Sequence, residues 1–169
     1  MIGALETHDG GSIRIMDAEL PPINSRRATM LRRNVINYLF QSFALVSELT
    51  VYQNLLLSMN FLDISEKKKV DIIDGILDAV HMSPHGNVTV NTLSGGEQRR
   101  VALARTMVKP GNLILADEPT GSLDTYAAEV SFSMIQSLSK ENNKSVIMVT
   151  YSPELAKRAD RIIDLVAFH

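Results

Sequence analysis

The stretch LSGGEQRRVALARTMVKPGNLILADEPTGSLD, residues 93–124, decides the fold of this chain. Ser94 is a favourable N-cap residue, and Glu97 three positions later completes a capping box, so a helix is expected to begin here. The apolar face of this helix continues until residues 109–111, Lys-Pro-Gly, which end it. The following apolar run, residues 113–116, is too short for a helix and is bounded by turn residues, which predicts a buried strand.

Both ends of this helix–strand unit carry groups suited to a phosphorylated ligand. Gly95 and Gly96 have no side chains, so their N–H groups are open to an anion at the positive end of the helix dipole. The strand delivers Asp117 and Glu118 to its carboxyl end, the edge at which open parallel sheets bind ligands. An aspartate there can hold Mg²⁺ through water, and the adjacent glutamate can orient or deprotonate an attacking water. Taken singly, each feature has a plainer explanation, because a glycine turn is usually a simple helix cap and a strand-end acidic pair is usually solvated.

The composition is that of an ordinary globular protein. The 169 residues are enough for one domain with a sizeable core, and the apolar fraction of 45% is typical of such domains. A net charge of −2 predicts no broad attraction to nucleic acid or anionic lipid. The absence of cysteine excludes disulfides and thiolate metal sites and fits a reducing compartment. No apolar run approaches the ~20 residues that span a bilayer, and the N-terminus lacks the pattern of a signal peptide.

Apolar patterns on either side of the central stretch predict helices that alternate with strands. Helices are expected over 25–33, 50–62, 65–82, 94–108, 124–140 and from 152, and strands over 12–16, 34–40, 113–116, 145–150 and 161–166. Residues 1–5 are apolar and have no start signal before them, so they are expected to be the end of a helix. This alternation indicates the α/β class, with a parallel sheet that has helices on both faces.

In the residues of its motifs and in the order of these motifs along the chain, the central stretch resembles the ATP-binding-cassette (ABC) ATPases, a branch of the P-loop NTPases. In that family the segments at 93–98, 113–118 and 119–124 are the signature motif, the Walker B strand with its catalytic glutamate, and the D-loop. The resemblance implies an α/β parallel-sheet core with a small helical insertion subdomain. It also implies roles for individual residues: nucleotide contacts by Ser94, Gly95, Gly96, Glu97, Gln98 and Asp124, a metal contact by Asp117, and catalysis by Glu118.

Residues 38–45, YLFQSFAL, match the Q-loop of this family, and the resemblance makes Gln41 a second Mg²⁺ ligand that also contacts the attacking water. By itself, a glutamine at a strand end is usually a surface polar residue, so this role depends on its position upstream of the signature motif. The chain is therefore expected to be part of one ABC ATPase domain over 1–169. In that scheme residues 34–92 form the Q-loop and helical subdomain, and residues 93–169 form the signature, Walker B, D-loop and switch region.

The chain departs from the family pattern at two points, and both concern the chemistry. None of its nine glycines is followed by lysine, so it contains no Gly-Lys-Ser/Thr phosphate loop, the Walker A motif. The opening residues 1–6, MIGALE, resemble the end of the helix after that loop, which implies that the N-terminal strands, the phosphate loop and the adenine platform are missing. Tyr151 stands where the family has its switch histidine, and a phenol gains no charge near neutral pH. Both departures are expected to lower ATP hydrolysis steeply.

The residues of these motifs are similar to those of the lipoprotein-release and macrolide-export branch of the family, and within this branch to those of the lactococcin-type bacteriocin exporters. The expected function is an ATP-binding subunit, or a fragment of one, that couples binding and hydrolysis of ATP with Mg²⁺ to export of a peptide, bacteriocin or lipophilic substrate. Its expected partners are a second cassette and transmembrane permease subunits, not nucleic acid, and its expected place is cytoplasmic, on the inner face of the cell membrane. A non-catalytic partner that supplies the signature motif in trans is the alternative. A cassette protein of translation or DNA repair is a third reading, opposed by the lack of a second cassette in the sequence.

Overall fold

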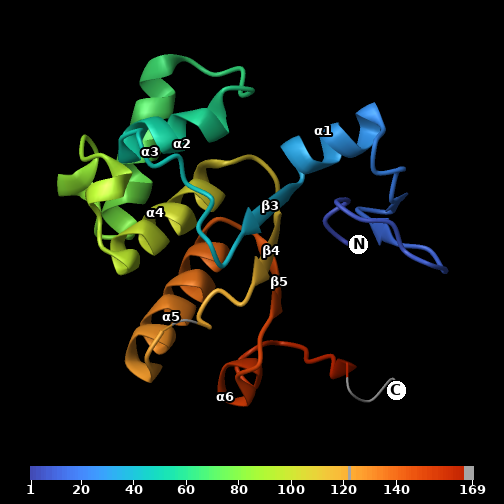
Figure 1. Cartoon of the computed structure of the whole chain (residues 1–169). Coiled ribbons are helices and arrows are strands. Elements are labelled where there is room, and N and C mark those ends of the chain that lie inside the picture. Colours follow the sequence, from blue (N-terminus) through green and yellow to red (C-terminus); the bar gives the residue numbers. More distant parts are fainter. Residues whose placement is uncertain (122, 166–169) are drawn as a thin grey trace.

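A computed structural model describes residues 1–121 and 123–165 of the chain (Figure 1). Its strands are β1 (Arg14–Ile15), β2 (Ala18–Glu19), β3 (Ile36–Leu39), β4 (Leu113–Asp117) and β5 (Ser145–Val149). Its α-helices are α1 (Arg26–Asn34), α2 (Val51–Met59), α3 (Glu66–Ala79), α4 (Gly95–Val108), α5 (Thr125–Glu141) and α6 (Pro153–Ala156). Two short 3₁₀ helices, η1 (Ser83–His85) and η2 (Val90–Thr92), lie between α3 and α4. The predicted alternation of helices and strands is thus confirmed along most of the chain.

Three parallel strands form the central sheet, in the order β3-β4-β5. Leu39 of β3 is level with Ala116 of β4, and Asp117 of β4 is level with Val149 of β5. The three strands therefore end at one edge of the sheet, and the loops that follow them start side by side. This arrangement confirms the predicted α/β class with a parallel sheet, and β1 and β2 form a separate antiparallel pair before it.

Three predicted helix starts are confirmed by their caps. Thr50 forms a capping box with Gln53 at the start of α2, and Ser94 forms one with Glu97 at the start of α4. The side chain of Asp124 caps α5. Each cap satisfies backbone N–H groups that have no partner within the helix, which is why these short sequence patterns fix the helix starts so well.

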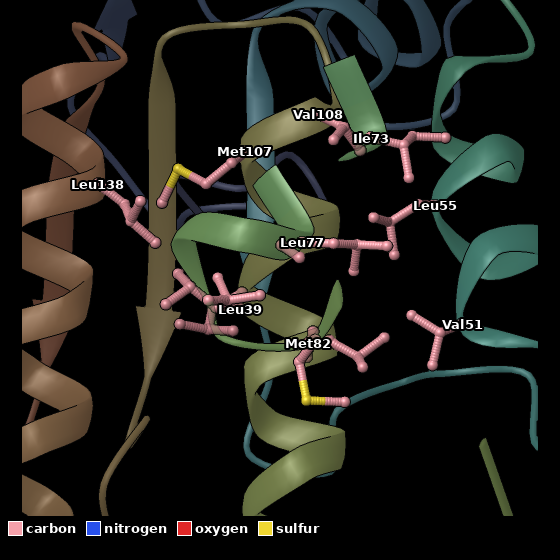
Figure 2. Close-up of a cluster of buried hydrophobic side chains, with 14 of the residues drawn as sticks. Leu39, Val51, Leu55, Ile73, Leu77, Met82, Met107, Val108 and Leu138 are labelled. Atoms are coloured by element: carbon pink, nitrogen blue, oxygen red, sulfur yellow. The ribbon is translucent and has the colours of Figure 1, made fainter. Parts of the chain in front are cut away.

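One apolar cluster joins the helices to the sheet. Figure 2 shows Leu55 of α2, Leu77 of α3 and Met107 of α4 in this cluster, together with Leu39 of β3 and Leu138 of α5. Burial of each of these side chains contributes about 1.5–3 kcal/mol. The helical pair α2 and α3 therefore packs through α4 onto the sheet and does not form a separate core.

Strand β5 is less buried than predicted. The strand over 145–150 was expected to be buried, but Ile147 is 43% exposed and Val149 is 50% exposed, while Val146 and Met148 are partly buried. In Figure 1, α4 and α5 lie on one side of the sheet. The described residues leave the face that carries Ile147 and Val149 largely uncovered, so the expected burial on both faces is wrong for this strand.

Two predicted end segments also differ from the structure. Residues 1–5 form turns and not the end of a helix, and Ala4 has a φ of 54°, which lies outside the right-handed helical region. Residues 161–165, from the strand predicted over 161–166, lie in no sheet. Val166 is outside the described residues. An apolar pattern alone does not make a strand, because strands are stabilised by pairing with a neighbour, and 161–165 do not pair with β5.

Two lysines bind backbone carbonyls at the amino ends of the strands. The Nζ of Lys109 donates to the carbonyl oxygens of Arg32, at 2.7 Å, and Ile36, at 2.5 Å. The Nζ of Lys144 donates to those of Lys109, at 2.9 Å, and Gly111, at 2.6 Å. The pKa of each amine is lowered from 10.5 to about 8, by burial in the case of Lys144 and by burial together with the positive charges of Arg105 and Lys144 in the case of Lys109.

Because the pKa values of Lys109 and Lys144 are lower in the folded chain than in the unfolded chain, we expect the free energy of unfolding to rise between about pH 8 and about pH 10. In this interval the unfolded chain retains protons on Lys109 and Lys144 that the folded chain has released, so raising the pH favours folding. Urea unfolding at both ends of the interval measures the effect. The double variant Lys109→Met/Lys144→Met is expected to show a flatter pH dependence, and a wild-type free energy of unfolding that falls across the interval would contradict the prediction.

Candidate functional site

The carboxyl edge of the sheet carries four of the predicted site residues, here called the sheet-edge group: Gln41, Asp117, Glu118 and Tyr151. Asp117 is the last residue of β4 and is exposed. Gln41 lies two residues after the end of β3, and Tyr151 lies two residues after the end of β5. Because the strand ends are level, all four residues leave the sheet at the same edge, as the sequence predicted.

Glu118 is the most constrained member of the sheet-edge group. Its backbone N–H donates to the carbonyl of Val149 at 3.0 Å, which extends the pairing of β4 with β5. Its Oε1 accepts the backbone N–H of Tyr151 at 2.7 Å. A side chain at Gly121 would place its Cβ 3.0 Å from Oε2 of Glu118, so any larger residue there would require the carboxylate to shift. Glu118 also has a φ of 43°, a conformation that non-glycine residues adopt mainly at functional or strained positions.

Tyr151 contacts Glu118 through its backbone and not through its phenol. The N–H group makes the bond to the carboxylate, while the side chain is 91% exposed. The structure therefore brings the backbone of the predicted switch position to the predicted catalytic carboxylate. The side chain that replaces the expected histidine points away into solvent.

A second group lies at the amino end of α4 and is here called the signature turn (residues 94–97). The Oγ of Ser94 donates to Oε2 of Glu97 at 2.6 Å, and the backbone N–H of Ser94 donates to the same oxygen at 2.8 Å. These two hydrogen bonds, with a smaller effect of the nearby positive side chains, lower the pKa of Glu97. The carboxylate is therefore held in its charged form within the cap.

The glycines of the signature turn are open to solvent. A Cβ at Gly95 or Gly96 would meet no atom within 4 Å, and both residues are exposed. Packing among the residues that the structure describes therefore does not require glycine at either position. Close approach by a group from outside does, because a side chain would separate that group from the N–H groups at the positive end of the helix.

The other two predicted nucleotide contacts are engaged in local structure. The Nε2 of Gln98 donates to the carbonyl of Leu93 at 3.0 Å, and Oδ1 of Asp124 accepts the N–H of Ala127 at 2.9 Å. Both side chains thus fix the segments that carry the motifs. Ser122, within the predicted D-loop, lies outside the described residues.

The structure places the two groups on different elements. The sheet-edge group follows β3, β4 and β5, whereas the signature turn lies at the amino end of α4, away from the sheet in Figure 1. Such a separation is suited to two half-sites, each completed by another molecule, and less suited to one closed pocket.

The sheet-edge group fits a metal ion only in part. Among residues 1–121 and 123–165, no cluster of three or more histidine, aspartate or glutamate side chains could hold a metal. Asp117 offers one exposed carboxylate, and Gln41 offers one amide oxygen at the same edge. Mg²⁺ is typically bound by one or two carboxylates with water and substrate phosphates, so this set fits Mg²⁺ that arrives with a nucleotide.

Asn54, a residue that no sequence pattern singled out, holds the segment after Gln41. Asn54 lies in α2 and is 1% exposed. Its Oδ1 accepts the N–H of Val46 at 2.8 Å, and its Nδ2 donates to the carbonyl of Val46 and to that of Thr50, both at 3.0 Å. One feature of the sequence could have indicated this role: Asn54 is a polar residue on the face of α2 that is otherwise apolar and buried.

Replacing Asn54 with Leu is expected to lower the free energy of unfolding by about 2–3 kcal/mol, because the backbone groups of Val46 lose their partners while remaining partly buried. Urea unfolding followed by circular dichroism measures the loss. Asn60→Leu, at an exposed position that ends the same helix, serves as the matched control and should shift the free energy by no more than about 0.5 kcal/mol. Equal effects of the two substitutions would contradict the role of Asn54.

Comparison with known protein families agrees with this geometry. Residues 1–121 match the family described as "ABC transporter". An uncharacterized ABC transporter ATP-binding protein of Mycobacterium tuberculosis is 33% identical over 165 residues, which cover 98% of this chain and 66% of the relative. The lipoprotein-releasing system ATP-binding protein LolD of Ehrlichia ruminantium is 35% identical over 168 residues, which cover 96% of this chain and 72% of LolD. The macrolide export ATP-binding/permease protein MacB of Aggregatibacter actinomycetemcomitans is 32% identical, and the alignment covers 98% of this chain and 26% of MacB.

Solved structures show the same fold. The dimeric structure of MJ0796, a bacterial ABC transporter cassette, superposes with a TM-score of 0.78 at 30% identity and covers 92% of this chain and 68% of the other. A dimeric structure of the same cassette in a post-hydrolysis state, bound to ADP and Pi, also superposes with a TM-score of 0.78, at 29% identity.

Proposed function

The chain belongs to the ABC transporter family of ATP-binding proteins, in the group related to lipoprotein release and macrolide export, and we propose that it completes nucleotide sites at the seam between two cassettes. In this proposal the sites bind and hydrolyse ATP with Mg²⁺, and the reaction drives export of a peptide, bacteriocin or lipophilic substrate. The whole chain, residues 1–169, forms part of one ABC ATPase domain, with the Q-loop and helical subdomain over 34–92 and the catalytic motifs over 93–169. The observation that carries the proposal is the signature turn, whose glycines face solvent with nothing in residues 1–121 and 123–165 to require them.

In this proposal the signature turn binds the terminal phosphate of ATP held by the other cassette. The N–H groups of Gly95 and Gly96 and the hydroxyl of Ser94 donate to phosphate oxygens, while Glu97 and Gln98 keep the turn in shape through the bonds described above. Ser94 donates its hydroxyl proton to Glu97 in the present structure, so it must turn this proton toward the phosphate when ATP is engaged. The dimeric cassette found among the structural neighbours supports this arrangement.

The sheet-edge group supplies the other half-site. Gln41 and Asp117 would hold Mg²⁺, which neutralises charge on the phosphates when bound. Glu118 would orient the attacking water through Oε2, because Oε1 is engaged with the backbone of Tyr151. Asp124, at the start of α5, would meet the second cassette beside this site.

A specific observation favours the alternative, a non-catalytic partner. The side chain of Tyr151 points into solvent and away from Glu118, and only its backbone N–H contacts the carboxylate. The position of the switch histidine therefore offers no side chain to the sheet-edge group, whereas the signature turn is intact. In this alternative the chain activates an ATP-bearing cassette and performs no hydrolysis itself.

We further propose that the chain sits on the inner face of the cell membrane through permease subunits. No helix in the described part of the chain is both long and apolar enough to cross a membrane. The segment after Gln41 and the adjacent α2 expose apolar side chains, namely Val46 and Leu57, with Phe61 just beyond. These residues give a permease segment an apolar surface on which to dock.

A complementation assay tests the proposed function. The probe is an intact LolD-type cassette whose own signature serine has been changed to arginine, so that its homodimer does not turn over ATP. Adding the wild-type chain is expected to restore phosphate release, because it supplies a working signature turn to ATP held by the probe. The proposal is wrong if both proteins are folded and the chain restores no phosphate release at any ratio of the two proteins.

A further inference from the structure

The loop after Gln41 holds two consecutive residues in the left-handed region. Phe43 has a φ of 61° and Ala44 a φ of 49°, and neither is glycine. Side chains disfavour this conformation, so it persists only where the surroundings determine it. Within the loop, the N–H of Phe43 donates to the carbonyl of Phe40 at 3.2 Å, and that of Ala44 to Ser42 at 2.7 Å.

Arg105 of α4 is the group that holds this conformation from outside the loop. One Nη donates to the carbonyl oxygen of Phe43 at 2.8 Å, and the other donates to that of Ala44. A guanidinium is a flat, rigid fork with a permanent charge, so it can hold two adjacent carbonyls in one orientation. A second arginine of α4, Arg99, lies with its guanidinium 5.3 Å from the centre of the Phe43 ring.

Both contacts come from the helix that carries the signature turn. Ser94 caps α4, and Arg105 lies in its last turn. Gln41, by contrast, precedes the loop by two residues and belongs to the sheet-edge group. Helix α4 therefore connects two elements of the proposed sites. Its amino end carries the signature turn, which faces the nucleotide of the other cassette, and its last turn contacts the loop after Gln41, which belongs to this chain's own half-site.

We propose that Arg105 is a positioning residue that fixes the Gln41 loop to α4, so that engagement of the signature turn is transmitted to Gln41. The contact of Arg105 with the loop is independent of function, whereas the transmission rests on the proposed function. A helix is stiff along its axis, so a movement of its amino end carries Arg105 and the two carbonyls with it. Sequence separation hides this connection, because Arg105 is 61 residues from Ala44.

Lys109 provides a matched control at the same end of α4. It also donates to two backbone carbonyls, those of Arg32 and Ile36, but these lie in α1 and β3 and not in the Gln41 loop. If Arg105 acted only by stabilising the fold, Arg105→Met and Lys109→Met would have similar effects everywhere.

Hydrogen–deuterium exchange of the full chain tests the position of Arg105. Arg105→Met is expected to raise exchange at the amides of residues 42–46 by about tenfold, which corresponds to the loss of one hydrogen bond to a charged group. Arg105→Lys, which offers a single ammonium, should give an intermediate rise, and Lys109→Met should leave this segment unchanged. The proposal is overturned if Lys109→Met raises exchange there as much as Arg105→Met, or if Arg105→Met has no effect.

The second arm adds the signature-disabled LolD-type cassette and Mg-ATP. In the wild-type chain, exchange is expected to fall at residues 93–98 and also at 40–46. In Arg105→Met, protection should remain at 93–98 and be lost at 40–46; protection at both would refute transmission through Arg105. If neither segment of the wild type responds, the proposed function fails, while the first arm still decides whether Arg105 positions the loop.

Discussion

Replacing Ser94 with arginine will lower the phosphate release that this chain restores to a signature-disabled cassette by about 100-fold or more. The expected size is that of removing one donor from a preorganised anion site. The substitution removes the hydroxyl at the cap and fills the space beside Gly95 and Gly96, which is open in the structure. It also removes the capping box that begins α4. Steady-state phosphate release at saturating chain concentration measures the effect.

The controls for this experiment separate loss of the site from loss of the fold. Ser137→Arg, at an exposed position of α5, introduces the same side chain elsewhere and should leave both melting and restored turnover unchanged. Ser94→Ala keeps the space open but lacks the donor, so it should fall between the wild type and Ser94→Arg. Restored turnover equal to wild type in Ser94→Arg would mean that the signature turn faces no nucleotide.

Glu118→Gln distinguishes the two proposed functions with a second probe, a LolD-type cassette that keeps its signature serine and has its own catalytic glutamate changed to glutamine. If the chain is a non-catalytic partner, adding it to this probe restores no turnover, and the substitution changes nothing. If the sheet-edge group of this chain takes part in hydrolysis, the wild-type chain restores turnover and the variant loses it, because an amide cannot accept the proton of an attacking water. The backbone N–H of Tyr151 can still bond to the amide oxygen, so the loop geometry is expected to survive.

Features that depend on neighbouring residues in the sequence were predictable. Ser94 and Glu97 are three positions apart, and the capping box follows directly from that spacing. The strand end at Asp117 followed from a short apolar run bounded by turn residues, and the common sheet edge followed from the alternation of strands and helices. The assignment of individual residues to roles in ATP chemistry came from the family resemblance and remains a prediction.

Features that depend on distant partners could not be predicted. The grip of Arg105 on the Gln41 loop joins segments about 60 residues apart, and an arginine on a helix is usually read as a solvated side chain. The strand predicted over 161–166 failed for a related reason. Its apolar residues indicate that the segment tends to be buried, but they do not show whether a neighbouring strand has a free edge with which it can pair. In the described residues, 161–165 do not pair with β5.

The largest effect on stability is expected for Gly111→Ala, which should lower the free energy of unfolding by about 4 kcal/mol, the sum of backbone strain and overpacking. Gly111 has a φ of +100°, a conformation that side chains disfavour. A Cβ built there would lie 2.4 Å from the carbonyl oxygen of Val35, which belongs to the rigid backbone entering β3. The carbonyl of Gly111 also accepts hydrogen bonds from Asn37, at 3.0 Å, and Lys144, at 2.6 Å, so the turn cannot move aside without breaking both.

Gly75→Ala is the matched control for this prediction. Gly75 lies in α3, where an added Cβ meets no atom within 4 Å, so alanine should raise the free energy of unfolding by about 0.5–1 kcal/mol through its higher helix propensity. The same chemical change is thus expected to act in opposite directions at the two positions. Urea unfolding of both variants beside the wild type measures the pair. If the free energy of unfolding of Gly111→Ala lies within about 1 kcal/mol of the wild-type value, the turn before β4 can rearrange. The close packing of this turn against Val35 would then not be needed to keep β3 and β4 in register.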